Sequence, residues 1–337
     1  MSGSGKGELG VALIGCGDIG ALRADAVGRA EGFRLVVACD RDEPRAAAVA
    51  AEHGVAAETD AAAAVARPDV DVAIISTPPS SHETLGRIAL EAGAHALIEK
   101  PLARSSSECR ALLDAAAAAD RVLATGFNYR FYPSVAKGAE ILAEGRIGRL
   151  DHIRSYTGYS ATEHSHDWLH DPEVMGGGVL RDNGIHLIDL TCWFLGDVAS
   201  VQGATAGRVW GFEGCEDNGF ALIEGTNGAI ATLQASWTEW RGYRFRIDLY
   251  GTKGCIRISC FPMITDVVWS ETTGGRTRCK RWMFPKVHVM ERLKSYRWVV
   301  LQSFVAELGA LREAIAGRDT ALATGGDGLV SIEVAER

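Results

Sequence analysis

Leu9–Gly20, LGVALIGCGDIG, is the stretch that decides the fold. Its first half is an unbroken apolar run, typical of a buried strand, and its second half spaces three glycines as G-x-G-x-x-G. Gly15 would permit the tight turn, Gly17 would let the backbone approach a pyrophosphate, and Gly20 would allow close helix packing. The stretch therefore predicts a strand–turn–helix unit that holds a dinucleotide at the N-terminus of its helix.

Short apolar runs alternate with Ala-rich helical stretches through the rest of residues 1–128. Continuous apolar strands that alternate with helices indicate a parallel sheet covered on both faces, so this part is predicted to be a doubly wound α/β domain of Rossmann type. The expected strands are Leu9–Ile14, Arg34–Cys39, Val70–Ser76, Ala94–Ile98 and Val122–Thr125, and the expected helices are Asp18–Arg29, Glu43–Glu52, Ser81–Ala92 and Ser105–Ala119.

Residues 129–337 have a different pattern. From Val198 to about Met283, strand-like segments follow one another through Gly or Asn-Gly turns, with no helical segment between them. This order is typical of an antiparallel or mixed sheet, so we predict a second domain of α+β class, whose closing helices are free to pack back on the first. Helices are expected at Ser134–Glu144, Gly178–Leu195, Trp298–Ala316 and Gly326–Glu336, with a further strand at Leu150–Tyr159.

Composition excludes several classes of protein. The 337 residues suffice for two domains, and 47% hydrophobic with 23% charged residues is ordinary globular usage. A net charge of −8 without any block of Lys and Arg argues against nucleic acid as a partner. The eight scattered cysteines contain no C-x-x-C pair, no secretory signal is recognisable, and no apolar run approaches the roughly 18 residues of a membrane span. We expect a soluble cytoplasmic protein without a membrane partner.

Asp40 is the residue that points to the kind of dinucleotide. It ends the second expected strand, twenty residues after Gly20. A carboxylate there would accept hydrogen bonds from an adenosine ribose diol and repel a 2′-phosphate, which favours NAD. Arg41 leaves NADP open, because a guanidinium can accommodate that phosphate. The loop Ser76–His82 also follows a strand and should reach the same edge of the sheet; His82 could face either the cofactor or solvent.

Three residues suggest a catalytic set. The strand Ala94–Ile98 runs into Glu99-Lys100-Pro101, so Lys100 lies at the tip of the strand and is held by a following proline, an unusual place for a merely solvated lysine. Asp182 and His186 are four apart, so on a helix they would share one face, although an ordinary helix pair has the same spacing. Hydride transfer from an alcohol needs a base for the hydroxyl proton, and histidine titrates near neutrality. Together with the glycine loop, these residues indicate a dehydrogenase site.

Four motifs occur together in the chain: Gly15–Gly20, Glu99-Lys100-Pro101, Gly126–Phe131 and Gly177-Gly178…Asp182…His186…Asp189. In their order and spacing, the chain resembles the GFO/IDH/MocA oxidoreductases, which include glucose–fructose oxidoreductase and inositol dehydrogenase, over nearly its whole length. The resemblance implies a Rossmann domain followed by a domain with a large open, mostly antiparallel sheet, which would form a homodimer or homotetramer. It also implies that Lys100 binds the reacting hydroxyl, His186 acts as acid/base and Asp182 supports them.

The segment Glu163–Asp171 is rich in metal-capable side chains, but its spacing matches no standard site and no cysteine is near, so no metal is expected. We interpret it as a loop over the substrate cleft, in which Trp168 would stack on a sugar or cover the nicotinamide. Acids of this loop, with Glu216, Asp217 and Glu239, would suit an amine-bearing substrate.

The prediction is an NAD-dependent dehydrogenase that moves a hydride between a secondary alcohol carbon of a sugar, amino sugar or cyclitol and the nicotinamide, giving a keto sugar. The high alanine content of the chain indicates a high-GC coding sequence, and this suggests aminoglycoside or modified-sugar biosynthesis. The alternatives are an NADP-linked keto-sugar reductase and a non-catalytic nucleotide-binding sensor. The predicted substrate contacts are Lys100, Tyr159, Trp168, Asp182 and His186. The predicted cofactor contacts are Gly15, Gly17, Asp18, Ile19, Gly20, Asp40, Arg41, Ser76, Thr77, Pro78, His82, Glu99, Lys100 and Asn128.

Overall fold

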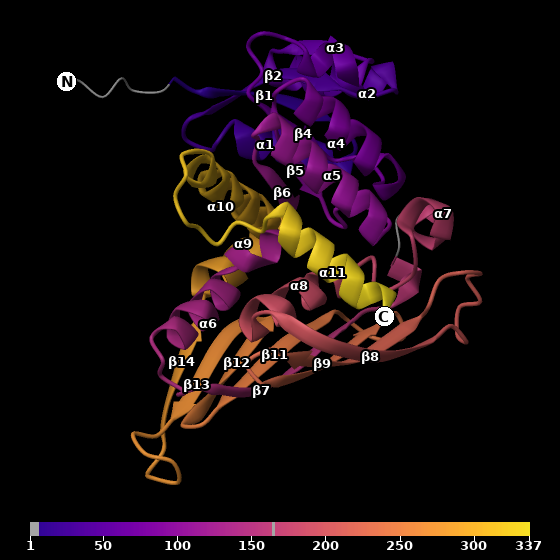
Figure 1. Cartoon of the computed structure of the whole chain (residues 1–337). Helices are drawn as coiled ribbons and strands as arrows, with labels where there is room; N and C mark the ends of the chain where they lie inside the picture. The colour runs from indigo at the N-terminus through magenta and orange to yellow at the C-terminus, as the bar shows by residue number, and fades with distance from the viewer. Residues whose placement is uncertain (1–6, 164–165) are drawn as a thin grey trace, which may run out of the picture. The chain divides into compact units, whose positions relative to one another are not determined.

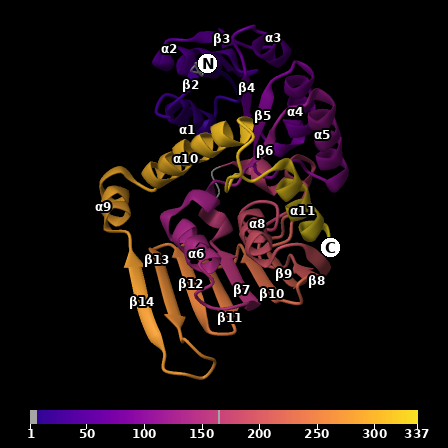
Figure 2. The same cartoon turned by 60° about the vertical axis from the view of Figure 1, so that its left-hand side comes forward.

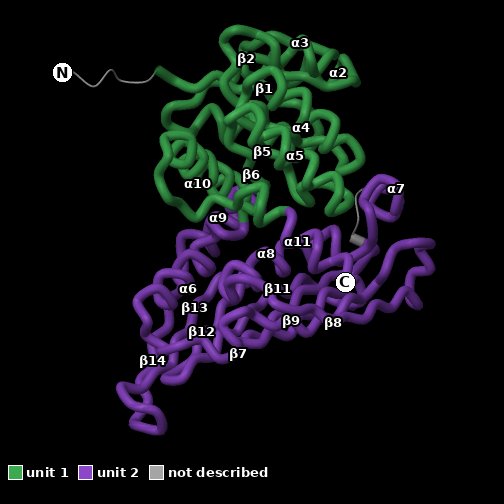
Figure 3. The backbone as a smooth tube through the Cα atoms, viewed as in Figure 1, with its two compact units in different colours: residues 1–128, 300–328 green, residues 129–299, 329–337 purple. Residues whose placement is uncertain are grey.

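The computed structural model describes residues 7–163 and 166–337 (Figure 1). The chain forms two compact units, coloured green and purple in Figure 3. Unit 1 comprises residues 1–128 and 300–328, and unit 2 comprises residues 129–299 and 329–337. A segment near the C-terminus therefore belongs to the same unit as the glycine loop. Within the described ranges, no helix combines the length and the apolar character needed to cross a membrane.

Unit 1 contains a six-stranded parallel sheet in the order β3-β2-β1-β4-β5-β6. The order reverses between β1 and β4, and in such sheets ligands bind where the order reverses, beyond the carboxyl ends of the strands. The doubly wound fold predicted for this part is thus confirmed. The strands are β1 Leu9–Ile14, β2 Phe33–Cys39, β3 Ala56–Glu58, β4 Val72–Ile75, β5 His95–Glu99 and β6 Leu123–Gly126.

The helices of unit 1 flank this sheet, and the last of them comes from far along the chain. Leu301, Phe304, Leu308 and Leu311 recur on one face of α10 and are buried in the same core as β1 and β4. This helical spacing explains why the segment packs here. The helices are α1 Asp18–Val27, α2 Glu43–His53, α3 Ala61–Val65, α4 His82–Glu91, α5 Ser106–Ala119 and most of α10 Arg297–Ile315, with a 3-10 turn η1 at Pro79–Ser81.

Unit 2 is built on an eight-stranded sheet in the order β14-β13-β12-β11-β7-β10-β9-β8. The pair β7–β10 is parallel and the other pairs are antiparallel, so the prediction of a large, mostly antiparallel sheet is confirmed. The strands are β7 Leu150–Gly158, β8 Val198–Ala206, β9 Asn218–Gly225, β10 Ile230–Ser236, β11 Arg244–Gly251, β12 Gly254–Cys260, β13 Met263–Trp269 and β14 Arg278–Met283.

Helices cover one face of this second sheet (Figure 2). Helix α6 packs on β12 and β13, and α8 packs on β7 and β10. Gly138 of α6 makes this packing close, since a Cβ there would lie 2.3 Å from Ile258. The helices that lie wholly or mostly in unit 2 are α6 Pro133–Ala143, α7 Pro172–Met175, α8 Gly184–Leu195, α9 Pro285–Lys294 and α11 Gly325–Glu336. Short 3-10 turns lie at η2 Asn128–Phe131, η3 Ala161–Glu163 and η4 Asp167–His170.

One predicted helix begins later than expected. The helix expected from Gly178 begins at Gly184, so Asp182 lies in the preceding turn, and the prediction that Asp182 and His186 share a helical face is wrong. The backbone hydrogen bonds show the irregularity, because the Arg181 and Asp182 amides share the Gly178 carbonyl and the Gly184 amide donates to Val179, five residues back instead of the four of an α-helix.

A buried ion pair ties η2 to α8 within unit 2. The guanidinium of Arg130 binds both carboxylate oxygens of Asp189, with N–O distances of 3.0 and 2.6 Å. Both side chains are almost fully buried. Removal of one partner of such a pair leaves an uncompensated charge in the core.

Arg130→Met is accordingly expected to lower the free energy of unfolding by about 3–5 kcal/mol, measured by urea denaturation. The control is Arg281→Met, which breaks an exposed pair with Asp266 and should leave the midpoint nearly unchanged. A shift for Arg130→Met no larger than that of the control would contradict this interpretation.

Candidate active site

The glycine loop of unit 1 has the shape that its sequence predicts. Gly15 has φ +95°, and a Cβ at Gly20 would lie 1.9 Å from the Gly15 carbonyl oxygen, so both positions require glycine. Gly17 is the N-cap of α1, and no side chain caps the helix there. Nothing lies within 4 Å of the point where a Gly17 Cβ would stand. The helix N-terminus is therefore open to an anionic group, while Asp18 and Ile19 are exposed beside it.

Asp40 is held at the end of β2 by this same loop. Its Oδ2 accepts a hydrogen bond from the Cys16 amide at 2.7 Å, and its Oδ1 accepts one from the Asp42 amide at 2.9 Å. Burial, followed by the Asp40 charge, raises the pKa of the Cys16 thiol to about 12. These two hydrogen bonds fix the orientation of the Asp40 carboxylate, and its remaining lone pairs can accept hydrogen bonds from a ribose diol. The neighbouring Arg41 is exposed.

The loop after β4 also fits a ligand. The Ser76 amide donates to the Ile14 carbonyl at 2.7 Å, which places residues 76–78 beside the glycine loop. A Cβ at Gly15 would lie 2.6 Å from the Ser76 carbonyl oxygen and 2.9 Å from the Thr77 methyl group. Among the residues described, the buried hydroxyl of Ser76 has no hydrogen-bond partner. A buried hydroxyl without a partner is what a bound group would satisfy.

His82 links two loops of unit 1. Its side chain is fully buried, and its ring nitrogens lie 2.7 Å from the Thr77 carbonyl oxygen and 2.8 Å from the Pro101 carbonyl oxygen. Burial lowers the pKa of this imidazole, and the backbone contacts oppose that shift. Exposure to solvent, one of the two orientations predicted for His82, is therefore wrong. The ring instead connects the loop after β4 to the residue after Lys100.

Glu99 and Lys100 lie at the end of β5, where the sequence predicts them. The Glu99 carboxylate accepts from Arg23 at 2.7 Å, and the fully buried Arg23 also pairs with Glu307 of α10. Lys100 is half-buried and precedes a cis peptide bond. Neither Arg23 nor Glu307 was among the predicted site residues; the local signal was an arginine between the apolar residues Leu22 and Ala24 of α1.

Asn128, the last residue of the first segment of unit 1, is also held in place. It is 6% exposed, and its side-chain amide donates to the Ser303 hydroxyl of α10 at 2.8 Å. The predicted cofactor contact of Asn128 stays a prediction.

His186 and Asp182 lie in unit 2 and are both almost fully buried. His186 is the third residue of α8, and its ring stacks on Tyr129 with centroids 4.2 Å apart. The Asp182 carboxylate accepts hydrogen bonds from the Tyr159 hydroxyl and from the Trp237 indole at 3.3 Å. Burial, followed by the Asp182 charge, raises the pKa of Tyr159, so this hydroxyl stays a donor. Tyr129 and Trp237 were not among the predicted site residues.

The segment Glu163–Asp171 is described in part, since His164 and Ser165 lie outside the described residues. Trp168 is half-buried and stacks with His166, and His170 stacks on Phe212 with centroids 3.8 Å apart. Burial lowers the pKa of His170. These aromatic contacts fit a loop that packs on unit 2, and the predicted sugar contact of Trp168 is not tested by them.

Three of the acids predicted to suit an amine-bearing substrate accept hydrogen bonds from other groups of unit 2. Glu216 accepts from backbone amides, and fully buried Asp217 accepts from the Val209 amide at 2.7 Å. Glu239 accepts from Tyr156 on the sheet.

Asp25, Glu52 and His53 in unit 1 have possible metal-ligand atoms within 4.8 Å of one another, but no other observation on these described residues indicates a cation.

The fold and the glycine cradle define a dinucleotide-binding protein of the Rossmann class, and comparison with known proteins agrees. Residues 9–127 match the model of the oxidoreductase family with an NAD-binding Rossmann fold, and residues 135–257 match the GFO/IDH/MocA C-terminal domain. The chain belongs to the GFO/IDH/MocA oxidoreductase family. The family, the oxidoreductase class and NAD as the cofactor are thereby confirmed.

Named relatives lie within the same family. The chain is 30% identical over 249 residues to inositol 2-dehydrogenase of Rhizobium meliloti, covering 72% of this chain and 73% of the relative. It is 29% identical over 276 residues to inositol 2-dehydrogenase 2 of Saccharopolyspora erythraea, covering 80% and 78%. The crystal structure of GenD2 from gentamicin A biosynthesis, in complex with NAD, superimposes with a TM-score of 0.82 at 25% identity, covering 100% of this chain and 95% of that one.

Proposed function

We propose that this protein is an NAD-dependent dehydrogenase that oxidises a ring secondary alcohol of a sugar, amino sugar or cyclitol to a ketone. The observation that carries the proposal is the complete set of Lys100, Asp182 and His186 in a chain of this family. Relatives named as inositol 2-dehydrogenases support a cyclitol or sugar as substrate. A sensor would have no use for an acid/base set.

The proposed chemistry divides between protein and cofactor. NAD, when bound, supplies the hydride acceptor. The Lys100 ammonium would bind the reacting hydroxyl, and His186 would take its proton while the hydride leaves the same carbon, so that the C–O bond becomes a carbonyl. Asp182 would support the imidazole or the substrate hydroxyl through its negative charge. Tyr159, which donates to Asp182, would complete this end of the site.

Asp40 offers a test of cofactor choice. Asp40→Ala is expected to weaken NAD binding by roughly tenfold to a hundredfold, because charged hydrogen bonds to the ribose diol are lost. The preference of the protein for NAD over NADP should become smaller for the same reason. Fluorescence titration with both dinucleotides measures this. Asp42→Ala is the control, since it removes the carboxylate that caps α2 but keeps the backbone amide that binds Asp40. Equal NAD affinity in Asp40→Ala and the unmodified protein would exclude the proposed ribose contact.

The dehydrogenase proposal is tested by turnover. Purified protein is titrated with NAD and NADP and then assayed for NADH absorbance with a panel of polyols, cyclitols and amino sugars. Oxidation with NAD supports the proposal. Ketone reduction with NADPH alone would favour a keto-sugar reductase, and dinucleotide binding without turnover in either direction would favour a sensor.

We propose amino sugars for that panel because GenD2, from gentamicin A biosynthesis, is a structural neighbour. Preferred oxidation of an aminoglycoside precursor would support a role in such a pathway, and preferred oxidation of a neutral cyclitol would oppose it.

We also propose a cytoplasmic location, which the eight free cysteine thiols support.

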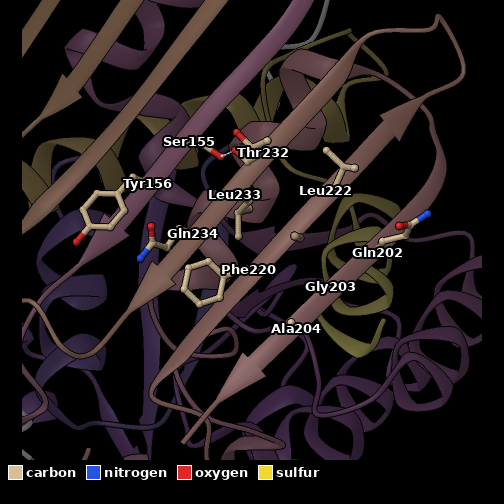
Figure 4. A pocket seen from close by; sticks show the side chains of 11 residues that line it. Ser155, Tyr156, Gln202, Gly203, Ala204, Phe220, Leu222, Thr232, Leu233 and Gln234 are labelled. Carbon is tan, nitrogen blue, oxygen red and sulfur yellow. Dashed lines mark hydrogen bonds between the residues drawn. The ribbon is translucent and has the colours of Figure 1, made fainter. Parts of the chain in front are cut away.

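We propose that the uncovered face of the unit 2 sheet joins two or four copies of this chain. Figure 4 shows Phe220 and Leu222 along β9 in a shallow hollow of that face, near Thr232 and Gln234 of β10. Phe220 and Leu222 are 45% and 46% exposed, and Ile230 beside them is 45% exposed. Apolar side chains gathered on one sheet face are typical of an interface.

Leu222→Lys is expected to convert the assembly to monomers, measured by light scattering after size exclusion, because it places a charge in the buried interface. Val289→Lys on α9, where Val289 is also exposed, is the matched control. A monomeric unmodified protein, or an assembly that survives Leu222→Lys, would exclude this interface.

A further inference from the structure

We infer that Glu216 is a positioning residue that holds the turn carrying Asp182, and thereby sets the catalytic geometry of unit 2. The inference rests on the proposed function, since it gives Asp182 and His186 their catalytic meaning. Glu216 is outside the proposed catalytic set, and its side chain and backbone bind the residues just before Asp182.

Three successive backbone amides of the turn are bound by Glu216. The Gly178 amide donates to its Oε2 at 2.7 Å, and the Leu180 amide donates to its Oε1 at 2.8 Å. Between them, the Val179 amide donates to the Glu216 carbonyl oxygen at 3.0 Å. A carboxylate that accepts two N–H groups makes charge-assisted bonds, which are stronger than neutral ones. These contacts satisfy amides that would otherwise belong to the first turn of a helix.

Gly178 permits this grip. A Cβ on Gly178 would lie 2.3 Å from the Glu216 carbonyl oxygen and 2.5 Å from its amide nitrogen. Backbone therefore meets backbone directly, and a displacement of Glu216 must move the turn. The glycine is required here for close approach rather than for flexibility.

Hydrogen bonds within the turn then position Asp182. The Asp182 amide donates to the Gly178 carbonyl at 3.1 Å, and the Gly184 amide, at the start of α8, donates to the Val179 carbonyl at 2.8 Å. The residues that Glu216 binds are thus the acceptors for Asp182 and for the helix that carries His186. Through this turn, Glu216 holds both Asp182 and the start of the helix that carries His186.

The neighbour of Glu216 fixes a donor to the Asp182 carboxylate. The Trp237 amide donates to the Asp217 carbonyl at 2.7 Å, and the Trp237 indole donates to Asp182 at 3.3 Å. Asp217 is itself fully buried and bound to the Val209 amide. The dipeptide 216–217 therefore controls the Asp182 backbone and one partner of its side chain.

Glu216→Gln tests the inference, because glutamine has nearly the same volume but only one acceptor oxygen, so its amide group must face an N–H donor. We expect kcat to fall by about tenfold to a hundredfold through loss of alignment, with little change in KM or in NAD affinity, since NAD is held by unit 1. Amide exchange measured by mass spectrometry should speed up across residues 178–184. Glu239→Gln, which removes a carboxylate elsewhere in unit 2, is the control.

The outcomes separate cleanly. Faster exchange with lower kcat supports the inference, whereas faster exchange with unchanged kcat, or unchanged exchange, overturns it. If Glu216→Gln does not fold, Glu216→Asp, whose shorter side chain reaches one amide at a time, is expected to show the same changes to a smaller degree. If the unmodified protein oxidises nothing in the panel, the proposed function fails by that result, and exchange alone then decides whether Glu216 holds the turn.

Discussion

His186→Asn is expected to lower kcat by about 10²- to 10⁴-fold, because asparagine cannot take the hydroxyl proton as the hydride leaves. NAD affinity should remain, since the glycine loop and Asp40 belong to unit 1. The assay is steady-state NADH formation with the best substrate of the panel, together with an NAD titration. Some loss from the missing ring stack with Tyr129 is included in this range.

The control for that variant is His152→Asn on β7, where the side chain is 43% exposed and pairs with Asp151. Its kcat should stay within about twofold of the unmodified enzyme, as is usual for exposed surface changes. A His186→Asn enzyme that keeps kcat within the same range would exclude His186 as the proton acceptor. Lys100→Met should give a comparable loss, and Lys100→Arg should not restore activity, because a planar guanidinium does not replace a compact ammonium.

The glycine loop gives the second large effect, and two variants of it should behave differently. In Gly17→Ala, the backbone has φ −76° and the new methyl group meets no protein atom within 4 Å, so the fold should be unaffected. NAD affinity should nevertheless fall at least about tenfold, because the methyl group stands where the pyrophosphate approaches. Titration and thermal unfolding measure the two properties separately.

In Gly20→Ala, by contrast, the methyl group would lie 1.9 Å from the Gly15 carbonyl oxygen. The turn must shift, so stability should fall by about 1–3 kcal/mol, together with NAD affinity. If Gly17→Ala binds NAD as the unmodified protein does, the pyrophosphate lies elsewhere. If Gly20→Ala is as stable as Gly17→Ala, the close contact between α1 and the turn is absent.

The sequence predicted best what local patterns determine. The predicted and observed bounds of β1, Leu9–Ile14, are the same, because an apolar run followed by the glycine motif is typical of a strand that ends in a turn. The short elements β3, Ala56–Glu58, and α3, Ala61–Val65, were missed, because alanine-rich segments of this length lack a periodic signal. Placement of 300–328 in unit 1 depends on tertiary packing of one α10 face, which the sequence left open.

The site shows the same division. The glycine loop, Asp40 and Lys100 follow from strand ends, so their neighbourhood could be predicted. The turn at Asp182 could not, because the apolar residues before it continue a helical pattern and Glu216, which binds the turn, lies 38 positions from Gly178. The Arg23–Glu307 pair, 284 positions apart, is likewise invisible to local analysis.

The central claim is direct hydride transfer from a carbinol carbon to NAD. The most direct measurement uses the best panel substrate, deuterated at its carbinol carbons, and determines the mass of the NADH that the purified protein forms. The account predicts NADH that carries one deuterium, and no such product from His186→Asn on the same time scale. Formation of unlabelled NADH, or of no NADH with any polyol, cyclitol or amino sugar, would contradict it.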